Sequence, residues 1–402
     1  MNMLTRLDPS VRADATAPLP PPGGRETVFA FQSPQGLMHG LGAAAPLASG
    51  PVATLEARLT AAFHAAGADA VVAGALPFDR EAADCLWQVA QVARRPAGTA
   101  RPVPRPAICR NWQIHHQPDA AGYARSVRRA LDIMAGEASA PDGLRKVVLS
   151  RSLLATADRD IDLAALFARL AVDPASTAFL VPLPPRDGVS RVMAGATPEL
   201  LLAKNGARIS SHPLAGSARR RPGDLAADAA AGAGLLRSRK DRREHAIVVE
   251  FILDTLAPWC RRLFRPQGLA LTSTASMWHL GTGIEGELKD PDVSAAVLAA
   301  ALHPTPAVCG VPREKAARHI AALEEYGRDF YAGTVGWCDG RGDGAWYVTI
   351  RCAEIAGRQA RLFAGAGIVP GSDPLAEAEE TGAKFAALLN ALDIPLDHEV
   401  RR

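Results

Sequence analysis

The segment AGAGIVPGSDPLAEAEETGAK, which ends at Lys384, constrains the fold more than any other part of this chain of 402 residues. After a glycine-containing turn, Asp373 is suited to cap a helix and Pro374 to be its first residue. In such a helix Glu377, Glu380 and Lys384 are three and four residues apart and share one face. The sequence therefore predicts that two acids and a cation project together from one rigid turn.

A second arrangement of this kind lies upstream, in SRKDRREHAIVVEFILDTLAPWC. Ser238 is suited to cap a helix that ends before Pro258, with Asp241 and Glu244 three residues apart on its first turn. Carboxylates from two helices can hold Mg²⁺, which prefers one or two carboxylates together with waters and substrate oxygens. The alternative is that all four acids are solvated helix charges, because acidic residues are common in first turns.

The composition is that of an ordinary globular protein, with 48% hydrophobic residues, 22% charged residues and a formal charge of +3. Because the charge is small, we expect no nucleic-acid partner. No apolar run approaches the length of a membrane helix, so we expect no membrane association. The six cysteines show no ligand spacing and are expected to be reduced thiols in a cytoplasmic protein: Cys85, Cys109, Cys260, Cys309, Cys338 and Cys352.

The chain is predicted to hold one domain. Residues 1–25 contain PLPPPGG and are expected to form a disordered leader. Residues 26–395 follow without a clear linker, and a family resemblance carried by motifs within 145–392 implies that they form a single catalytic domain. Helices are predicted over Leu55–Gly67, over Arg80–Ala93 and near Leu163–Ala171, and KVVLSRSLLA and STAFLVPL read as strands. Strands grouped in runs with helices between them favour an α+β architecture with largely antiparallel sheets.

A hairpin is predicted in the segment that follows Glu199. Asn-Gly is a strong hairpin signal, and a two-residue loop at Asn205–Gly206 would set Glu199 opposite His212. Glu199 would then lie beside the loop of residues 213–217.

A strand is predicted over Trp346–Ala353, because its residues alternate between an apolar and a more polar face. Arg351 falls on the polar face. An arginine there could clamp a substrate carboxylate, although a cross-strand ion pair is the commoner use.

Several further segments occur in a fixed order along the chain: KVVLSR, GATPELLL, SHPLAGSARR, KDRREH, SMWHLGT, LHPTPAVCG, YAGTVGW, DGAWYVTIR and AGAGIVPGSDPLAEAEET. With them the chain resembles the chorismate-utilising enzymes (anthranilate synthase component I-like), and most closely the isochorismate synthases of the siderophore type. The resemblance covers residues 145–392 and is weak upstream. It implies the chorismate-binding-enzyme fold, with two large, mostly antiparallel sheets packed as a sandwich with flanking helices.

The resemblance also implies roles for individual residues. Lys146 looks like the general base that activates water, and Glu199 like the general acid. Glu244 and Glu380 look like Mg²⁺ ligands, with Asp241 and Glu377 close by or acting through water. Residues that look like substrate binders are Gly216, Ser217, His279, Ala307, Tyr331, Ile350, Arg351, Phe363, Gly365, Gly367 and Lys384.

The reaction that the resemblance implies is the Mg²⁺-dependent conversion of chorismate to isochorismate. Water adds at one ring carbon while hydroxide departs from another, so one base and one acid are needed on opposite sides of the ring. Lys146 has to be neutral and Glu199 protonated. A charged His212 would oppose protonation of Glu199, so we expect His212 to be neutral or turned away.

Alternative functions remain open at the level of sequence. A salicylate synthase would also make isochorismate and would then eliminate pyruvate from it. The sequence Met277–Trp278–His279 and the PLAGSARRR loop favour the isomerase. An ammonia-using relative with a glutaminase partner is disfavoured by Lys146, and a Mg²⁺-binding interaction module is a non-enzymatic alternative. We expect a monomer that acts on the small molecule chorismate and supplies a 2,3-dihydroxybenzoate or catechol siderophore pathway.

Overall fold

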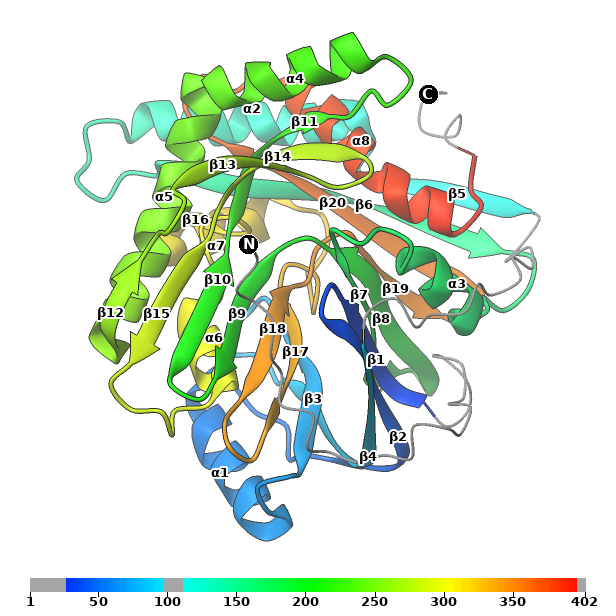
Figure 1. Ribbon diagram of the computed structural model, residues 1–402. Coiled ribbons are helices and arrows are strands. Elements are labelled where there is room, and N and C mark those ends of the chain that lie inside the picture. Colours follow the sequence, from blue (N-terminus) through cyan, green and yellow to red (C-terminus); the bar gives the residue numbers. More distant parts are fainter. Residues whose placement is uncertain (1–26, 97–110, 396–402) are drawn as a thin grey trace.

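The structure, a computed structural model, describes residues 27–96 and 111–395 as a mixed α+β protein (Figure 1). The helices of these residues are α1 (Leu55–Ala66), α2 (Ala120–Gly136), α3 (Leu163–Leu170), α4 (Leu225–Arg237), α5 (Arg239–Leu256), α6 (Ala295–Leu302), α7 (Arg313–Leu323) and α8 (Pro374–Ala391). The strands are β1 (Thr27–Ser33), β2 (Gly36–Pro46), β3 (Val71–Leu76), β4 (Cys85–Pro96), β5 (Trp112–Gln117), β6 (Lys146–Ala157), β7 (Thr177–Arg186), β8 (Val189–Thr197), β9 (Leu200–Asn205), β10 (Arg208–His212), β11 (Leu214–Arg219), β12 (Cys260–Phe264), β13 (Leu269–Ser273), β14 (Met277–Thr282), β15 (Ile284–Leu288), β16 (Gly310–Val311), β17 (Thr334–Asp339), β18 (Gly344–Val348), β19 (Cys352–Ala356) and β20 (Gln359–Ile368).

Hydrogen bonds join 17 of the described strands into one antiparallel network, and β11, β14 and β13 form a separate sheet of three. Neighbours in the network run in the order β12, β15, β10, β9, β18, β17, β3, β4, β2, β1, β7, β8, β19, β20 and β6, with β5 and β16 both paired to β6. The strands from β12 to β2 and those from β7 to β6 are joined through β1. The two groups of strands share one core, in which Phe179 of β7 lies in the same cluster as Trp346 of β18. The predicted α+β class with large antiparallel sheets is confirmed.

The helices cover this network, and α2, α7 and α8 pack together against β6. A second buried cluster joins Tyr123 of α2, Leu149 of β6, Ile320 of α7 and Ala378 of α8. These contacts place α8 over β20 and β6, which Figure 1 shows in the upper half of the molecule. Both helices named from the sequence have the predicted caps: Ser238 accepts from the backbone N–H of Asp241, and Asp373 accepts from the second and third residues of α8.

Helices α1 and α3 lie where the sequence predicted them, but the helix predicted over Arg80–Ala93 is wrong. Cys85–Pro96 forms strand β4, which pairs with β2 and β3. The reason is tertiary: Leu86 and Val89 are buried in the core between partners that are distant in sequence, and this burial overrides the local helix preference of the alanines.

The predicted hairpin exists, but its predicted register is wrong. The two-residue loop is Gly206–Ala207, so Asn205 pairs with Arg208, and His212 pairs with Leu200 rather than with Glu199. Gly206 has a φ of +55° at the first loop position, as a II′ turn requires, and Asn205 stays in the strand.

The single strand predicted over Trp346–Ala353 is also wrong. Strand β18 ends at Val348 and β19 begins at Cys352, with Arg351 between them at a φ of +50°. The left-handed backbone at Arg351 breaks the alternation, so the side chain of Arg351 is placed by the loop and not by a sheet face.

Some predictions fall outside the described residues or concern the whole chain. The leader 1–25 and Cys109 lie outside the described ranges. The five cysteines inside them are free and buried. Within those ranges no helix is both long enough and apolar enough to cross a membrane.

Candidate active site

A pocket lies where β20 and the short sheet of β11, β14 and β13 meet the first turns of α5 and α8. It is lined by Val148, Pro198, Glu199, Leu214, Ala215, Gly216, Ser217, Glu244, His279, Ala307, Val308, Tyr331, Ala332, Ile350, Arg351, Phe363, Ala364, Gly365, Gly367, Glu380 and Lys384. The structure thus brings together nearly all of the residues named from the sequence. Lys146, Asp241 and Glu377 are not part of this lining, and each contacts a residue in or beside it.

The face of α8 that the sequence predicted is present in the pocket. Lys384 Nζ lies 2.6 Å from Glu380 Oε1 and donates to the backbone oxygen of Gly365 at 2.8 Å. Ser217 of β11 donates to the same Glu380 oxygen at 2.7 Å. Burial alone would raise the pKa of Glu380, but the charge of Lys384 and these hydrogen bonds outweigh it and lower the pKa. Glu380 is therefore a carboxylate.

Glu244 of α5 reaches the pocket from the other side. Its Oε1 lies 2.9 Å from Nζ of Lys146, whose side chain is fully buried at the start of β6. A side chain at Gly367 would collide with Glu244, because its Cβ would lie 2.1 Å from Oε1. Glycine at this position of β20 is what lets the glutamate and the lysine meet.

Asp241 and Glu377 stand just outside the pocket. Asp241 packs against Gly216, and Glu377 accepts a hydrogen bond from Lys240. Burial raises the pKa of both carboxyl groups, and the negative charge of Glu380 raises them further. Acids therefore crowd at this end of the pocket, although the neighbouring lysine partly offsets their charge.

Glu199 is an acid of a different kind. It follows β8 in the chain, is only 3% exposed, and has a pKa raised to about 8 by burial, which outweighs the opposing charge of Lys146. A carboxyl group in this position holds a proton at neutral pH and can donate it. Burial likewise lowers the pKa of His212, in accord with the expectation that His212 is neutral.

The remaining wall combines cations with aromatic rings. Arg351 is buried, and burial lowers its pKa to about 10. The rings of Tyr331 and Phe363 stack at 4.7 Å between centroids. His279 makes a hydrogen bond to the backbone of Gly216. Burial, together with the charge of Arg351, holds the pKa of His279 well below its ordinary value. Its Nε2 has no hydrogen-bond partner among the described residues, so a neutral His279 offers an acceptor to a ligand.

The pocket's donor set fits a divalent cation that takes few protein ligands. Glu244 of α5 and Glu380 of α8 supply two carboxylates to the pocket. The residues that the structure describes contain no group of three or more His, Cys, Asp or Glu side chains placed around a metal. The set therefore suits Mg²⁺, which completes its coordination with water and substrate oxygens, and does not suit an ion held by protein atoms alone.

Sequence reasoning missed part of the lining: Val148, Pro198, Leu214, Ala215, Val308, Ala332 and Ala364. Most of these directly adjoin a residue that the sequence did single out. Val148 lies two positions after Lys146 and so shares its face of the strand, a signal that period-two alternation provides.

Comparison with known proteins adds a relationship to this geometry. The family model described as "Chorismate binding enzyme" matches residues 69–393. Isochorismate synthase DhbC of Bacillus subtilis is 44% identical over 71% of this chain and 71% of its own, and isochorismate synthase EntC of Escherichia coli K12 is 41% identical over 86% and 88%. The crystal structure of a putative 2,3-dihydroxybenzoate-specific isochorismate synthase, DhbC from Bacillus anthracis, has a TM-score of 0.84 at 36% identity, covering 92% of this chain and 97% of that one.

Proposed function

Because this chain belongs to the family of chorismate-binding enzymes, we propose that it is an isochorismate synthase, an isomerase that converts chorismate to isochorismate. The observation that carries the proposal is the pairing of two groups at one pocket: Glu199, whose raised pKa keeps it protonated, and Lys146, buried within electrostatic reach of it. The similarity to isochorismate synthases over most of the chain supports the same activity.

The two groups account for both proton transfers of the isomerisation. To act as the base, Lys146 has first to give up a proton, and with it the charge of its ion pair with Glu244. It then takes a proton from the water that attacks the ring. Glu199 gives a proton to the departing hydroxyl, which leaves as water. One water is consumed and one is released, and the return of one proton from Lys146 to Glu199 through solvent restores both groups, so the reaction is balanced as an isomerisation. The raised pKa of Glu199 matches this task, since an acid must still hold its proton at neutral pH.

Chorismate carries two carboxylates, and the pocket offers cations and donors for them. Arg351 can hold a carboxylate bidentately, and Lys384 supplies a compact charge close to the carbonyl of Gly365. Tyr331, Ser217 and the backbone at Gly216 add polar contacts. The stacked Tyr331 and Phe363, with Ala307 and Ile350, provide apolar walls for the ring and the enolpyruvyl group.

Mg²⁺ would be held by Glu244 and Glu380, with Asp241 and Glu377 contributing negative charge around them. When bound, the ion would supply positive charge for a substrate carboxylate. The chemistry of the ring remains with Lys146 and Glu199.

We extend the proposal to the wider setting of the enzyme. The names of the similar proteins include a 2,3-dihydroxybenzoate-specific and a vibriobactin-specific isochorismate synthase, which supports a role in making a catechol siderophore. We place the enzyme in the cytoplasm as a monomer that acts on a small molecule. A salicylate synthase is the second candidate, because it would use the same acid, base and pocket.

Product analysis tests the proposal. Purified protein is incubated with chorismate and Mg²⁺, and the products are separated by chromatography, with a parallel sample containing EDTA. We expect isochorismate, no salicylate or pyruvate, and no turnover with EDTA. Salicylate together with pyruvate would establish the second candidate, and unchanged chorismate in the presence of Mg²⁺ would overturn both.

A further inference from the structure

A buried ion pair stands directly behind the pocket and has no part in the chemistry described above. Glu324 follows α7, and Arg328 lies four residues later in the loop that leads to Tyr331. Their side chains are 2% and 3% exposed. Arg328 Nε donates to Glu324 Oε2 at 2.9 Å and Nη2 to Oε1 at 2.5 Å, so the contact is bidentate.

Both side chains also bond the edge of β6. Strand β16 pairs with β6 over only two residues, at Lys146 and Val147, and Cys309 extends the contact to the N–H of Val148. Beyond that point Arg328 Nη2 donates to the oxygen of Val148 at 2.7 Å, and Glu324 Oε1 accepts from the N–H of Ser150 at 2.7 Å. The ion pair thus fills the gap on this edge between β16 and β5, which pairs with β6 from Ser152 onward.

The same arginine also bonds the segment that precedes β16 and contacts the ring of Tyr331. Arg328 Nη1 donates to the oxygen of Val308 at 2.7 Å, and both Val308 and Val148 line the pocket. Its guanidinium also lies over the ring of Tyr331, 5.8 Å from the centroid. One planar group therefore contacts three residues that line the pocket and holds them at fixed separations, which a planar fork of donors can do and a flexible ammonium cannot.

Glu324 extends the network on its other side. Its Oε1 accepts from the hydroxyl of Ser150 at 2.8 Å, and that hydroxyl lies 2.8 Å from the hydroxyl of Tyr326. The ring of Tyr326 packs against Phe363 of the pocket, with 5.9 Å between centroids. Residues 146, 148 and 150 share one face of β6, so the network fixes the strand that carries the general base.

We propose that Arg328 and Glu324 form a positioning pair for the reaction: they complete the edge of β6 and hold Lys146, Val308 and Tyr331 in the relative placement that turnover needs. This inference rests on the proposed function for the identity of the base. A buried ion pair is weak evidence for stability, because desolvation offsets most of its attraction. Its geometric role is the better explanation of why two charges are placed here.

The first test removes both charges. In Glu324→Gln/Arg328→Gln no unpaired charge is left buried, so the variant should fold, but the bridges to Val148 and Val308 are lost. Chorismate consumption is measured so that the rate does not depend on which product forms. We expect kcat to fall about 100-fold, the effect of misplacing reacting groups by about 1 Å, while KM changes by less than about threefold.

The matched control is another bidentate pair far from the pocket, in which Asp84 is buried and Arg58 is half-buried. Arg58 of α1 bonds Asp84 through Nη1 at 2.9 Å and Nη2 at 2.5 Å, and Nη1 also donates to the backbone oxygen of Ala48 at 2.9 Å. Arg58→Gln/Asp84→Asn should lose thermal stability to a similar extent with kcat within about twofold of wild type. Equal loss of kcat in the two double variants would show that any loss of a buried pair has this effect, and would overturn the proposal.

Two milder variants keep the test decisive if the double variant does not fold. Arg328→Lys keeps the charge beside Glu324 but cannot reach Val148 and Val308 together, and we expect kcat to fall at least about tenfold. Tyr326→Phe removes a single hydroxyl, and we expect a fall of about threefold. A folded Arg328→Lys or double variant with wild-type kcat overturns the positioning role, and if neither folds, unchanged kcat in Tyr326→Phe does so. Failure of the wild type to consume chorismate instead refutes the proposed function, and with it the role of the pair.

Discussion

Nζ of Lys146 lies 2.9 Å from Oε1 of Glu244, so the predicted general base is ion-paired with a predicted metal ligand. The contact joins the first residue of β6 to the first turns of α5, and Gly367 of β20 leaves the space for it. A change at either residue alters the charge beside the other. For this reason the role of each is best tested against a control that is also a buried, ion-paired side chain.

Replacement of the base should stop turnover. In Lys146→Gln the amide keeps a polar group beside Glu244 but cannot accept a proton from water, and we expect kcat to fall about 10²- to 10⁴-fold. Lys204→Gln is the matched control, because Lys204 is equally buried and its Nζ lies 2.9 Å from Asp343 Oδ1, away from the pocket. Steady-state kinetics and thermal unfolding are measured for both variants. Retention of more than about a tenth of wild-type kcat by Lys146→Gln would remove Lys146 from this role.

Loss of a metal ligand should raise the requirement for Mg²⁺. Glu244→Gln and Glu380→Gln each remove a negative charge from the lining of the pocket. We expect the Mg²⁺ concentration for half-maximal activity to rise by more than about tenfold, because loss of even an outer-shell partner of a metal costs at least about that much affinity. Asp241→Asn serves as the control, since Asp241 does not line the pocket. Mg²⁺ titrations of initial rate give the three values. Equal and mild shifts in all three variants would contradict the assignment of the two glutamates.

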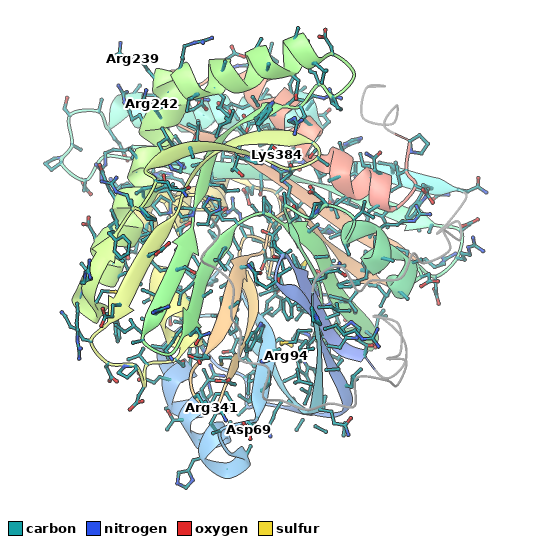
Figure 2. All side chains as sticks on the ribbon, viewed as in Figure 1. Asp69, Arg94, Arg239, Arg242, Arg341 and Lys384 are labelled. Atoms are coloured by element: carbon teal, nitrogen blue, oxygen red, sulfur yellow. The ribbon has the colours of Figure 1, made fainter. Side chains whose placement is uncertain are left out.

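Lys384 should act on substrate affinity. It lines the pocket, and Lys384→Gln removes a cation available to a substrate carboxylate, so we expect KM for chorismate to rise about 10- to 100-fold at saturating Mg²⁺. Arg341→Gln is the control, because Arg341 pairs with Asp69 at the opposite end of the molecule from Lys384 (Figure 2). A change in kcat with an unchanged KM would show that Lys384 does not bind the ground-state substrate.

The local parts of the site could be predicted from the sequence. The caps at Ser238 and Asp373 are set by neighbouring residues, and with them the faces that carry Glu244 and Glu380. Arg239 and Arg242, labelled in Figure 2, are exposed on this part of α5, whereas Glu244 is buried.

The parts that depend on distant pairing could not be predicted. The sequence around Asn205–Gly206 allows two placements of the two-residue loop. The structure has the loop at Gly206–Ala207, and in this register β10 also pairs with β15 on its other side. Arg351 reads as part of a strand until the left-handed backbone interrupts it. The contact of Lys146 with Glu244 joins two elements that no local pattern connects, so only the folded chain reveals it.

The last prediction concerns the acid. Glu199→Gln can still hydrogen-bond the leaving hydroxyl but has no proton to give, so we expect chorismate binding to survive while kcat falls about 10²- to 10⁴-fold. Binding is followed by calorimetry with Mg²⁺ present, and isochorismate by chromatography. Pro198 precedes Glu199 and also lines the pocket, so Pro198→Ala serves as a control for small changes of the local backbone. Loss of binding and rate in equal proportion would make Glu199 a substrate-positioning residue.

The ionisation of Glu199 gives this assignment a second, independent measurement. Burial raises its pKa from the ordinary 4.5 to about 8, so between these values the folded state binds a proton that the unfolded state has lost. Its contribution to stability is therefore complete below pH 4.5 and is lost as the pH rises through about 8. Urea unfolding of wild type and Glu199→Gln across this range should show the wild type losing stability relative to the variant as the pH increases. Wild-type kcat/KM, which reports ionisation of the free enzyme, should decline above about pH 8 for the same reason. Parallel stability curves for the two proteins would mean that Glu199 is ionised in the folded state, and it could not then be the acid.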